Sequence, residues 1–477
     1  MSTRLNNFTQ FANALLPHEV SYLLSVQQLK DPENISILEL INHNTHNPEQ
    51  TFPYKTSIDK RKYSNLKNWI NERLEAIDVD SFYNRLLDID RKIMLDNISP
   101  KEEDMLIKYI KGFDHPPYYF IRFYEIIRSY RFYLVIRFRH YYNRIVDRFL
   151  MEHQDLYNRC IETNMKLHEA TIDIVNQYAL NNTESRKWEE WLTEVFYNEE
   201  LDGQNRYMAL IRLTMIYFNY KEFDKLNRVY DDLDGMMKTG KFYSRRILLN
   251  YYSNRVMLHS KRNEPNKAAS FGFLSIRQRS GDYLHYINNL CAVLLRQNHN
   301  SAALKLMQDS FPELKNTKNH HTRVGFVSFY IRALNKNNRA VEAAGYAESF
   351  LNGYKDQIFE FRWHTFFGAY IQSLIAQSKY HRIITLARKY KLADREKEYQ
   401  LRAVYIPTIA WYLAVAEFME DQISFQVFSE KIVSPASPLA SDPHKCRLMM
   451  ELAIELHNHV PAVFMDNGHV KGIQWSI

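Results

Sequence analysis

The feature that most restricts the fold of this chain is its scarcity of glycine and proline, which number 12 and 14 among 477 residues. Average proteins use roughly 7% glycine and 5% proline. β-Sheets and phosphate-binding loops depend on tight turns, and these two residues supply most of them. A chain so poor in both is most simply helical, so we expect an all-α protein.

The bulk composition is that of a folded protein, with 45% hydrophobic and 25% charged residues. At 477 residues the chain exceeds one compact core, so we expect several domains or an elongated repeat structure. Three scattered cysteines, Cys160, Cys291 and Cys446, suit a reducing compartment. The N-terminus lacks the apolar core of a signal peptide, and no apolar run reaches the roughly 18 residues that a spanning helix needs. A cytoplasmic location is therefore expected.

Local signals divide the chain into three regions. Residues 1–115 contain several short helical segments, among which Ser99-Pro100-Lys101-Glu102 predicts a capping box that opens a helix ending at Gly112. Residues 116–203 predict long helices, basic and aromatic over 118–150 and acidic over 184–202. We expect those two oppositely charged segments to pair with each other inside the protein. Residues 204–477 form the third region.

The third region repeats a helix–turn–helix pattern. Helical segments meet at polar turns spaced about 35 to 44 residues apart, the range of helical-hairpin solenoids. Each unit consists of a first and a second helix, and in two units the second helix begins with similar residues, Lys267-Ala268-Ala269 and Ser301-Ala302-Ala303. The small residues at these positions allow neighbouring helices to pack closely. The six predicted turns are Asn219–Glu222, Lys261–Asn266, Asn298–Ser301, Asn335–Arg339, Gln377–His381 and Met419–Gln422.

The best single unit, Tyr283–Leu314, resembles the tetratricopeptide repeat superfamily. Its packing positions hold Ile287, Leu290, Cys291 and Leu294 in the first helix, and Ala303, Met307 and Ser310 in the second. The aromatic turns Asn219–Phe223 and Ser378–Tyr380 also resemble that family. The resemblance implies an α-α superhelix of about six helical hairpins. It also implies a concave face, over residues 205–433, that binds extended peptides or partner helices.

No motif for catalysis, metal binding or a cofactor emerges from the sequence. Gly235–Lys241 has the glycine spacing of a phosphate loop, but Phe242 stands where a magnesium-binding Ser or Thr is required. We interpret this string as a turn between repeats, with Gly235 and Gly240 ending helices. The histidine pairs His43/His46 and His320/His321 lie in predicted polar linkers without further ligands, so we expect them to be solvated loop residues. We therefore predict no enzyme activity, no metal and no cofactor.

The clustering of positive charge is the one feature of the sequence that is unusual enough to suggest a function. Residues 235–281 carry ten Lys or Arg against the single acid Glu264, a net charge of +9, whereas the whole chain carries +7. Tyr243, Tyr251 and Tyr252 are interleaved with these cations. The stretch is either a solvated helix surface or a surface for an anionic partner.

The predicted function is non-catalytic binding of a protein or peptide partner, expected to be acidic, in the groove of the helical repeats. The alternative is a nucleic-acid-associated protein that uses the basic stretch 235–281. We expect the arginines of that stretch to be solvent-exposed, so that reversing their charge would leave the fold intact. The side chains predicted to contact the partner are Arg245, Arg246, Asn250, Arg255, Asn288 and Arg296.

Overall fold

The computed structural model describes residues 5–48, 50–180, 184–402, 404–465 and 467–473, and it divides the chain into two compact units, 1–251 and 252–477. The expected all-α fold is confirmed: the described residues form helices and turns, and the only extended pairing among them is one bridge between Phe464 and Val470. Within the described part, no helix combines the length and apolar composition needed to cross a membrane. The boundaries expected at 115/116 and 203/204 both lie inside the first unit.

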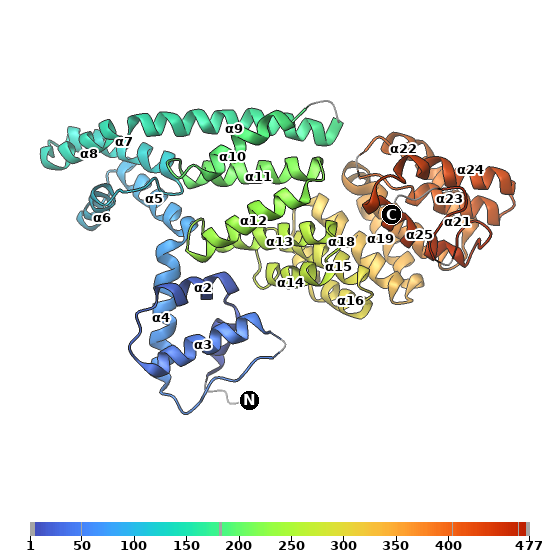
Figure 1. Cartoon of the computed structure of the whole chain (residues 1–477), viewed down its shortest axis with the longest axis horizontal. Helices are drawn as coiled ribbons and strands as arrows, with labels where there is room; N and C mark the ends of the chain where they lie inside the picture. The colour runs from blue at the N-terminus through green and yellow to red at the C-terminus, as the bar shows by residue number, and fades with distance from the viewer. Residues whose placement is uncertain (1–4, 49, 181–183, 403, 466, 474–477) are drawn as a thin grey trace. The chain divides into compact units, whose positions relative to one another are not determined.

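The first unit begins with short helices and continues with longer ones (Figure 1). Within it α9 and α11 run side by side, with α10 packed against α11. Its helices are α1 (Asn6–Asn13), α2 (Pro17–Val26), α3 (Pro32–His46), α4 (Lys60–Ile77), α5 (Val79–Met94), α6 (Pro100–Lys111), α7 (Phe120–Ile136), α8 (His140–Glu152), α9 (Gln154–Leu180), α10 (Glu189–Tyr197), α11 (Gly203–Asn219) and α12 (Phe223–Lys238). Helix α13 (Arg245–Lys261) contains the boundary between the units.

The predicted capping box forms at the start of α6. Glu102 accepts a hydrogen bond from the backbone N–H of Ser99 at 2.9 Å, Pro100 occupies the first helical position, and Gly112 follows the last helical residue. Glu102 and Pro100 satisfy or remove backbone donors that the N-terminus of the helix leaves unpaired, and the Gly112 N–H donates to the Lys108 carbonyl (3.0 Å) at its C-terminus.

Four arginines of residues 118–150 form ion pairs in the described structure, all with carboxylates outside residues 184–202. The expected pairing with residues 184–202 is therefore wrong for these four, which are Arg122, Arg131, Arg137 and Arg139. Arg137 binds Asp96 (2.6 Å), Arg139 binds Glu103 (2.5 Å), and Arg131 binds Asp147 (2.5 Å). The reason is packing: α7 lies against α5 and α8, which brings these arginines within ion-pair distance of Asp96 after α5, Glu103 on α6 and Asp147 on α8.

The second unit is a series of hairpins followed by a C-terminal helix. Its elements after α13 are α14 (Pro265–Ser275), α15 (Tyr283–Arg296), α16 (Asn300–Asp309), α17 (Phe311–Asn316), α18 (His320–Lys336), α19 (Ala340–Gln357), a π-helical turn (Ile358–Arg362), α20 (Trp363–Ile375), α21 (Tyr380–Tyr390), α22 (Leu392–Tyr399), α23 (Thr408–Met419), α24 (Phe425–Ala436) and α25 (Pro443–His457). The first helices α15, α18, α20 and α23 pack on one another in that order.

All six predicted turns are present, and each has the same local geometry. One residue of each turn has a left-handed backbone, with φ between 55° and 59°, and the next N–H bonds the carbonyl five residues earlier. This is the Schellman arrangement, which satisfies the last carbonyls of a helix. The left-handed residues are Lys221, Asn263, Asn298, Asn338, Ser378 and Asp421.

Amide side chains join successive hairpins of the second unit. Gln297 donates to Asn266 Oδ1 (2.9 Å), and Gln377 donates to the carbonyl of Ala340 (3.0 Å). Asn337 makes the equivalent bond to the carbonyl of Asn300, also at 2.9 Å. These three donors are spaced 40 residues apart, so the residue at the equivalent position of each repeat binds the turn of the preceding repeat. The bonds keep equivalent faces of the first helices in register.

Candidate functional site

The candidate site is a cavity of about 440 Å³ in the second unit. One wall consists of the first helices α15, α18, α20 and α23, and the opposite wall is α25. Its cationic lining residues are Arg296, Arg332 and Lys336, and its acidic ones are Glu451 and Glu455. The volume falls in the range of sites that bind small molecules or short peptide segments, roughly 300–1,000 Å³.

The repeat geometry brings the lining residues together. Ala292 and Arg332 are 40 residues apart, and so are Arg296 and Lys336. Because successive first helices stack in register, side chains at this spacing occupy equivalent places on the same face. The result is a row of cations along α15 and α18.

Helix α25 is held firmly as the opposite wall. Glu455 accepts hydrogen bonds from Gln372 Nε2 (2.6 Å) and from the Tyr412 hydroxyl (2.8 Å). Burial and the neighbouring Glu455 raise the pKa of Tyr412 well above its ordinary value, so its hydroxyl stays protonated and donates. The far face of α25 buries Met449 and Leu456 in the hydrophobic core of the unit. The helix is thus part of the fold, and the cavity is built into it.

The other charged side chains that line the cavity form no ion pairs with one another. Arg296, Arg332, Lys336 and Glu451 make no ion pair within 4.0 Å to any described residue. The surrounding protein raises the pKa of Glu451 by desolvation, although the three cations act in the opposite direction. Glu451 is nevertheless exposed at the cavity, and no cation of the described residues lies within ion-pair distance of it.

Arg332 is one of the three cations that line this cavity. Its guanidinium is half-buried, lies 5.8 Å from the ring centroid of Phe329, and approaches the backbone of Gly368. No hydrogen bond connects it to another described side chain. A planar guanidinium with free donors can bind a carboxylate or phosphate through two parallel hydrogen bonds.

Of the six residues predicted from the sequence, Arg296 alone lines this cavity. Arg245, Arg246 and Asn250 belong to the first unit. Arg245 pairs with the fully buried Glu19 (2.7 Å), and Arg246 pairs with Asp80 (2.8 Å). These two arginines therefore connect α13 to the N-terminal helices α2 and α5.

Of the other predicted residues, Asn250 is half-buried, and two are buried in the protein. Asn250 accepts a hydrogen bond from the Tyr207 hydroxyl at 3.2 Å. Arg255 is only 4% exposed and lies 5.7 Å from the ring of Phe271, so the expectation that it is solvent-exposed is wrong. Asn288 is buried as well, on the side of α15 that packs against Gly325 of α18.

Carboxylates from elsewhere in the chain neutralise much of the basic stretch 235–281. Lys241 binds Glu199 at 2.6 Å and Arg279 binds Glu313 at 2.5 Å. Gly240 adopts φ of +87° in the turn after α12, as a residue between helices should, but Gly235 lies inside α12 and ends no helix. The histidine pairs expected in loops lie instead on helices, His43/His46 on α3 and His320/His321 at the start of α18. Among the residues that the structure describes, no three His, Cys, Asp or Glu side chains cluster in a way that could hold a metal ion.

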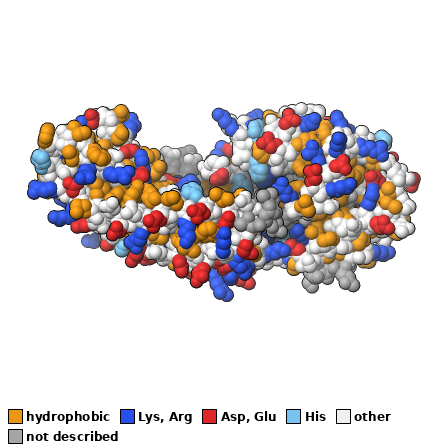
Figure 2. Space-filling view, turned by 90° about the horizontal axis from the view of Figure 1, so that it is seen from above, with side chains coloured by type: hydrophobic (Ala, Val, Ile, Leu, Met, Phe, Trp, Pro, Cys, Tyr) orange, Lys and Arg blue, Asp and Glu red, His pale blue; other side chains and the backbone are white. Residues whose placement is uncertain are grey.

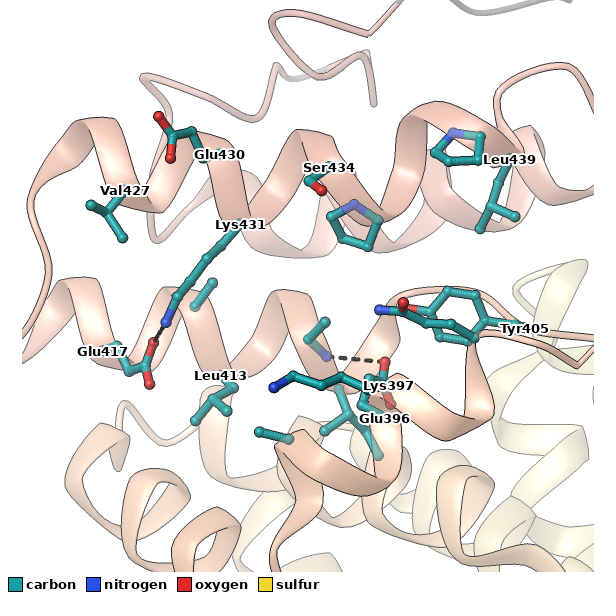
Figure 3. Close-up of a pocket in the computed structure, with 17 residues that line it drawn as sticks. Glu396, Lys397, Tyr405, Leu413, Glu417, Val427, Glu430, Lys431, Ser434 and Leu439 are labelled. Carbon is teal, nitrogen blue, oxygen red and sulfur yellow. Dashed lines mark hydrogen bonds and ion pairs between the residues drawn. The ribbon is translucent and has the colours of Figure 1, made fainter.

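The second unit also contains a larger cavity, of about 590 Å³, between α22, α23 and α24 (Figure 3). Leu413 and Val427 contribute to its largely apolar lining, and Lys431 spans the helices to pair with Glu417 at 2.5 Å. Glu396 accepts the backbone N–H of Ala410 at 3.3 Å. Its principal charged groups already have partners. A ligand in this cavity would therefore make mostly apolar contacts and few ionic ones.

Sequence reasoning did not select Arg332, Lys336 or Glu451. The spacing of 40 residues between equivalent first-helix positions could have identified the first two. Nothing in the sequence points to Glu451, because α25 follows the last predicted hairpin and its position against the first helices is a tertiary property. Comparison with known protein families, with curated proteins and with solved structures found no match to this chain.

Proposed function

We propose that this chain is a non-catalytic binding protein whose second unit holds an acidic segment of a protein or peptide partner. The observation that carries the proposal is the row of cations, Arg296, Arg332 and Lys336, which faces a cavity without ion pairs. The proposal includes a tetratricopeptide-like repeat for the stacked hairpins and a cytoplasmic location. The cytoplasmic location is supported by the three cysteines, which are buried and not in disulfides: Cys160, Cys291 and Cys446.

The charge balance of the cavity favours an anionic ligand. Three cations face one unpaired carboxylate, Glu451, since Glu455 is already occupied by Gln372 and Tyr412. Arg332 and Lys336 are four residues apart on one helix, and like charges at that spacing repel each other. A ligand carboxylate or phosphate between them would relieve that repulsion and satisfy free donors. Lining residues such as Phe329 and Leu452 provide apolar contact for the rest of a peptide.

The alternative, nucleic-acid binding through residues 235–281, has less support. Arg245 and Arg246 are paired with Glu19 and Asp80, and Lys241 is paired with Glu199. A surface that tracks phosphates needs cations available to replace counterions. These lysines and arginines of residues 235–281 would first have to break their ion pairs with carboxylates of this chain.

The test is a binding measurement with labelled acidic peptides, with and without a phosphoserine, and with single-stranded RNA. We expect the native chain to bind the acidic peptides, with affinity that falls as salt rises. Arg332→Glu should weaken binding at least tenfold, because it replaces a bidentate donor with a like charge to the ligand.

The matched control is Lys305→Glu, which makes the same change of charge at an exposed position of the second helix α16. It should leave peptide binding unchanged. Equal loss of binding in both variants, or binding of RNA alone, would contradict a role for the cavity.

A further inference from the structure

One end of the first unit exposes large apolar side chains at two neighbouring helix turns. Met94 and Leu95 lie at the turn after α5, with exposures of 70% and 67%. Ile136 and Phe138, at the turn after α7, are 71% and 78% exposed. In the space-filling view, hydrophobic and basic side chains are interleaved on the surface of the molecule (Figure 2).

Ion pairs hold these two turns together. Arg137 of the second turn binds Asp96 of the first at 2.6 Å, and Arg139 binds Glu103 of α6 at 2.5 Å. The apolar residues of both turns therefore form one surface, together with two more from the exposed stripe of α7. We call it the apolar tip, and it consists of Met94, Leu95, Phe132, Val135, Ile136 and Phe138.

Phe138 has a backbone conformation that its side chain does not favour. Its φ is 55°, in the left-handed region, where an L residue other than glycine costs roughly 1–2 kcal/mol. Phe242 has a similar φ of 58°, but it is only 6% exposed and packs against Arg206, so burial offsets its strain. Phe138 has no such compensation within the first unit. Three equivalent hairpin turns of the chain use asparagine instead, at Asn263, Asn298 and Asn338.

We propose that the apolar tip is a self-association surface that binds a second copy of this chain. Six large side chains, each more than half exposed, offer on the order of 600 Å² of apolar area. A stable interface buries about 800 Å² per partner, of which about 65% is apolar in homodimers. The area therefore matches what a two-fold dimer needs.

The charges at the edge of the tip fit the same partner. Arg137 with Asp96 and Arg131 with Asp147 place both signs side by side. An isologous interface requires a self-complementary surface, and a rim with both signs allows two copies to exchange arginine–aspartate contacts. An anionic membrane would instead be attracted by unpaired cations, whereas Arg131, Arg137 and Arg139 at the edge of the tip are all in ion pairs.

The decisive experiment is sedimentation velocity of the full chain over a concentration series, comparing the native protein with Phe138→Asn. Asparagine tolerates the left-handed backbone, so this variant should unfold at the same or a higher temperature than the native protein. It should nevertheless raise the dimer dissociation constant at least tenfold, as loss of a central aromatic contact does. A native protein that stays monomeric throughout the series overturns the proposal.

A second variant, Ile136→Glu, should also abolish the dimer. Its control is Met165→Glu on α9, another exposed apolar residue of the same unit (63%), which should leave the dimer intact. A dimer that survives both tip substitutions, or one lost equally in the control, shows that the tip is not the interface. Co-sedimentation of a monomeric native protein with anionic vesicles, abolished by Ile136→Glu, would assign the tip to a lipid surface and overturn self-association.

Discussion

Arg245 in the first unit and Arg332 in the second are both arginines on helices of the repeat region, yet their surroundings are opposite. The Arg245 guanidinium is 2.7 Å from Glu19, a carboxylate with 0% exposure. The Arg332 guanidinium faces a cavity, with no carboxylate of the described residues at ion-pair distance. A basic stretch in the sequence therefore does not locate a binding surface, because its acidic partners can lie hundreds of residues away.

The largest expected effect is on Arg245. Arg245→Ala should lower the free energy of unfolding by about 3 kcal/mol, since it leaves a buried charge on Glu19 without its cation. Glu19 keeps the hydrogen bonds from the Tyr243 hydroxyl (2.6 Å) and the Leu16 N–H (2.8 Å), so the loss should not be larger. Urea denaturation measures it. A loss below about 1 kcal/mol would show that the Arg245 ion pair contributes no more to the free energy of unfolding than an exposed ion pair does.

A smaller effect is expected at His444, at the start of α25. Burial, with Lys261 and Arg296 nearby, lowers the pKa of His444 to about 4. The folded state therefore holds this imidazole neutral, while the unfolded chain protonates it near pH 6.5. Stability should fall by roughly 2 kcal/mol as the pH drops from about 6.5 to 4, because the unfolded state then binds more protons. His444→Asn should remove that part of the pH dependence, and an unchanged slope would contradict the assignment.

Glu451 should show a weaker effect of the opposite sign. Desolvation raises its pKa, so the folded state binds its proton more tightly than the unfolded chain does. The stability that protonated Glu451 contributes is therefore lost as the pH rises through the pKa of this group in the folded state. Glu451→Gln should consequently stabilise the protein at neutral pH. The gain should stay below about 1 kcal/mol, because the side chain is open to solvent. Thermal unfolding at neutral and acidic pH tests this, and a variant that is less stable at neutral pH would show that Glu451 is a structural ion-pair partner.

The smallest effect on stability is expected at Arg332, and it sharpens the comparison with Arg245. Arg332→Gln should change the free energy of unfolding by less than about 0.5 kcal/mol, since no ion pair is lost and repulsion from Lys336 is relieved. Urea denaturation alongside Arg245→Ala provides the measurement. A loss as large as that of Arg245→Ala would mean that Arg332 supports the fold and that the cavity is no binding site.

The helices and turns were predictable because their causes are local. Scarcity of glycine and proline favours helix everywhere, and each polar turn needs one left-handed residue that Asn263, Asn298 or Asn338 adopts easily. The capping box at Ser99 depends on residues three positions apart. Such signals lie within one or two helical turns of the residues they control.

The site was less predictable, because pairing between distant charges decides it. The sequence by itself determined an all-α chain of stacked hairpins and the number of cations on their first helices. Only the tertiary structure decided that Glu19 and Asp80 neutralise Arg245 and Arg246, whereas Arg332 faces a cavity with no described carboxylate at ion-pair distance. The physical reason is that Coulomb interactions depend on separation in space, and neither helical period nor composition specifies which carboxylate lies within about 4 Å of a given guanidinium.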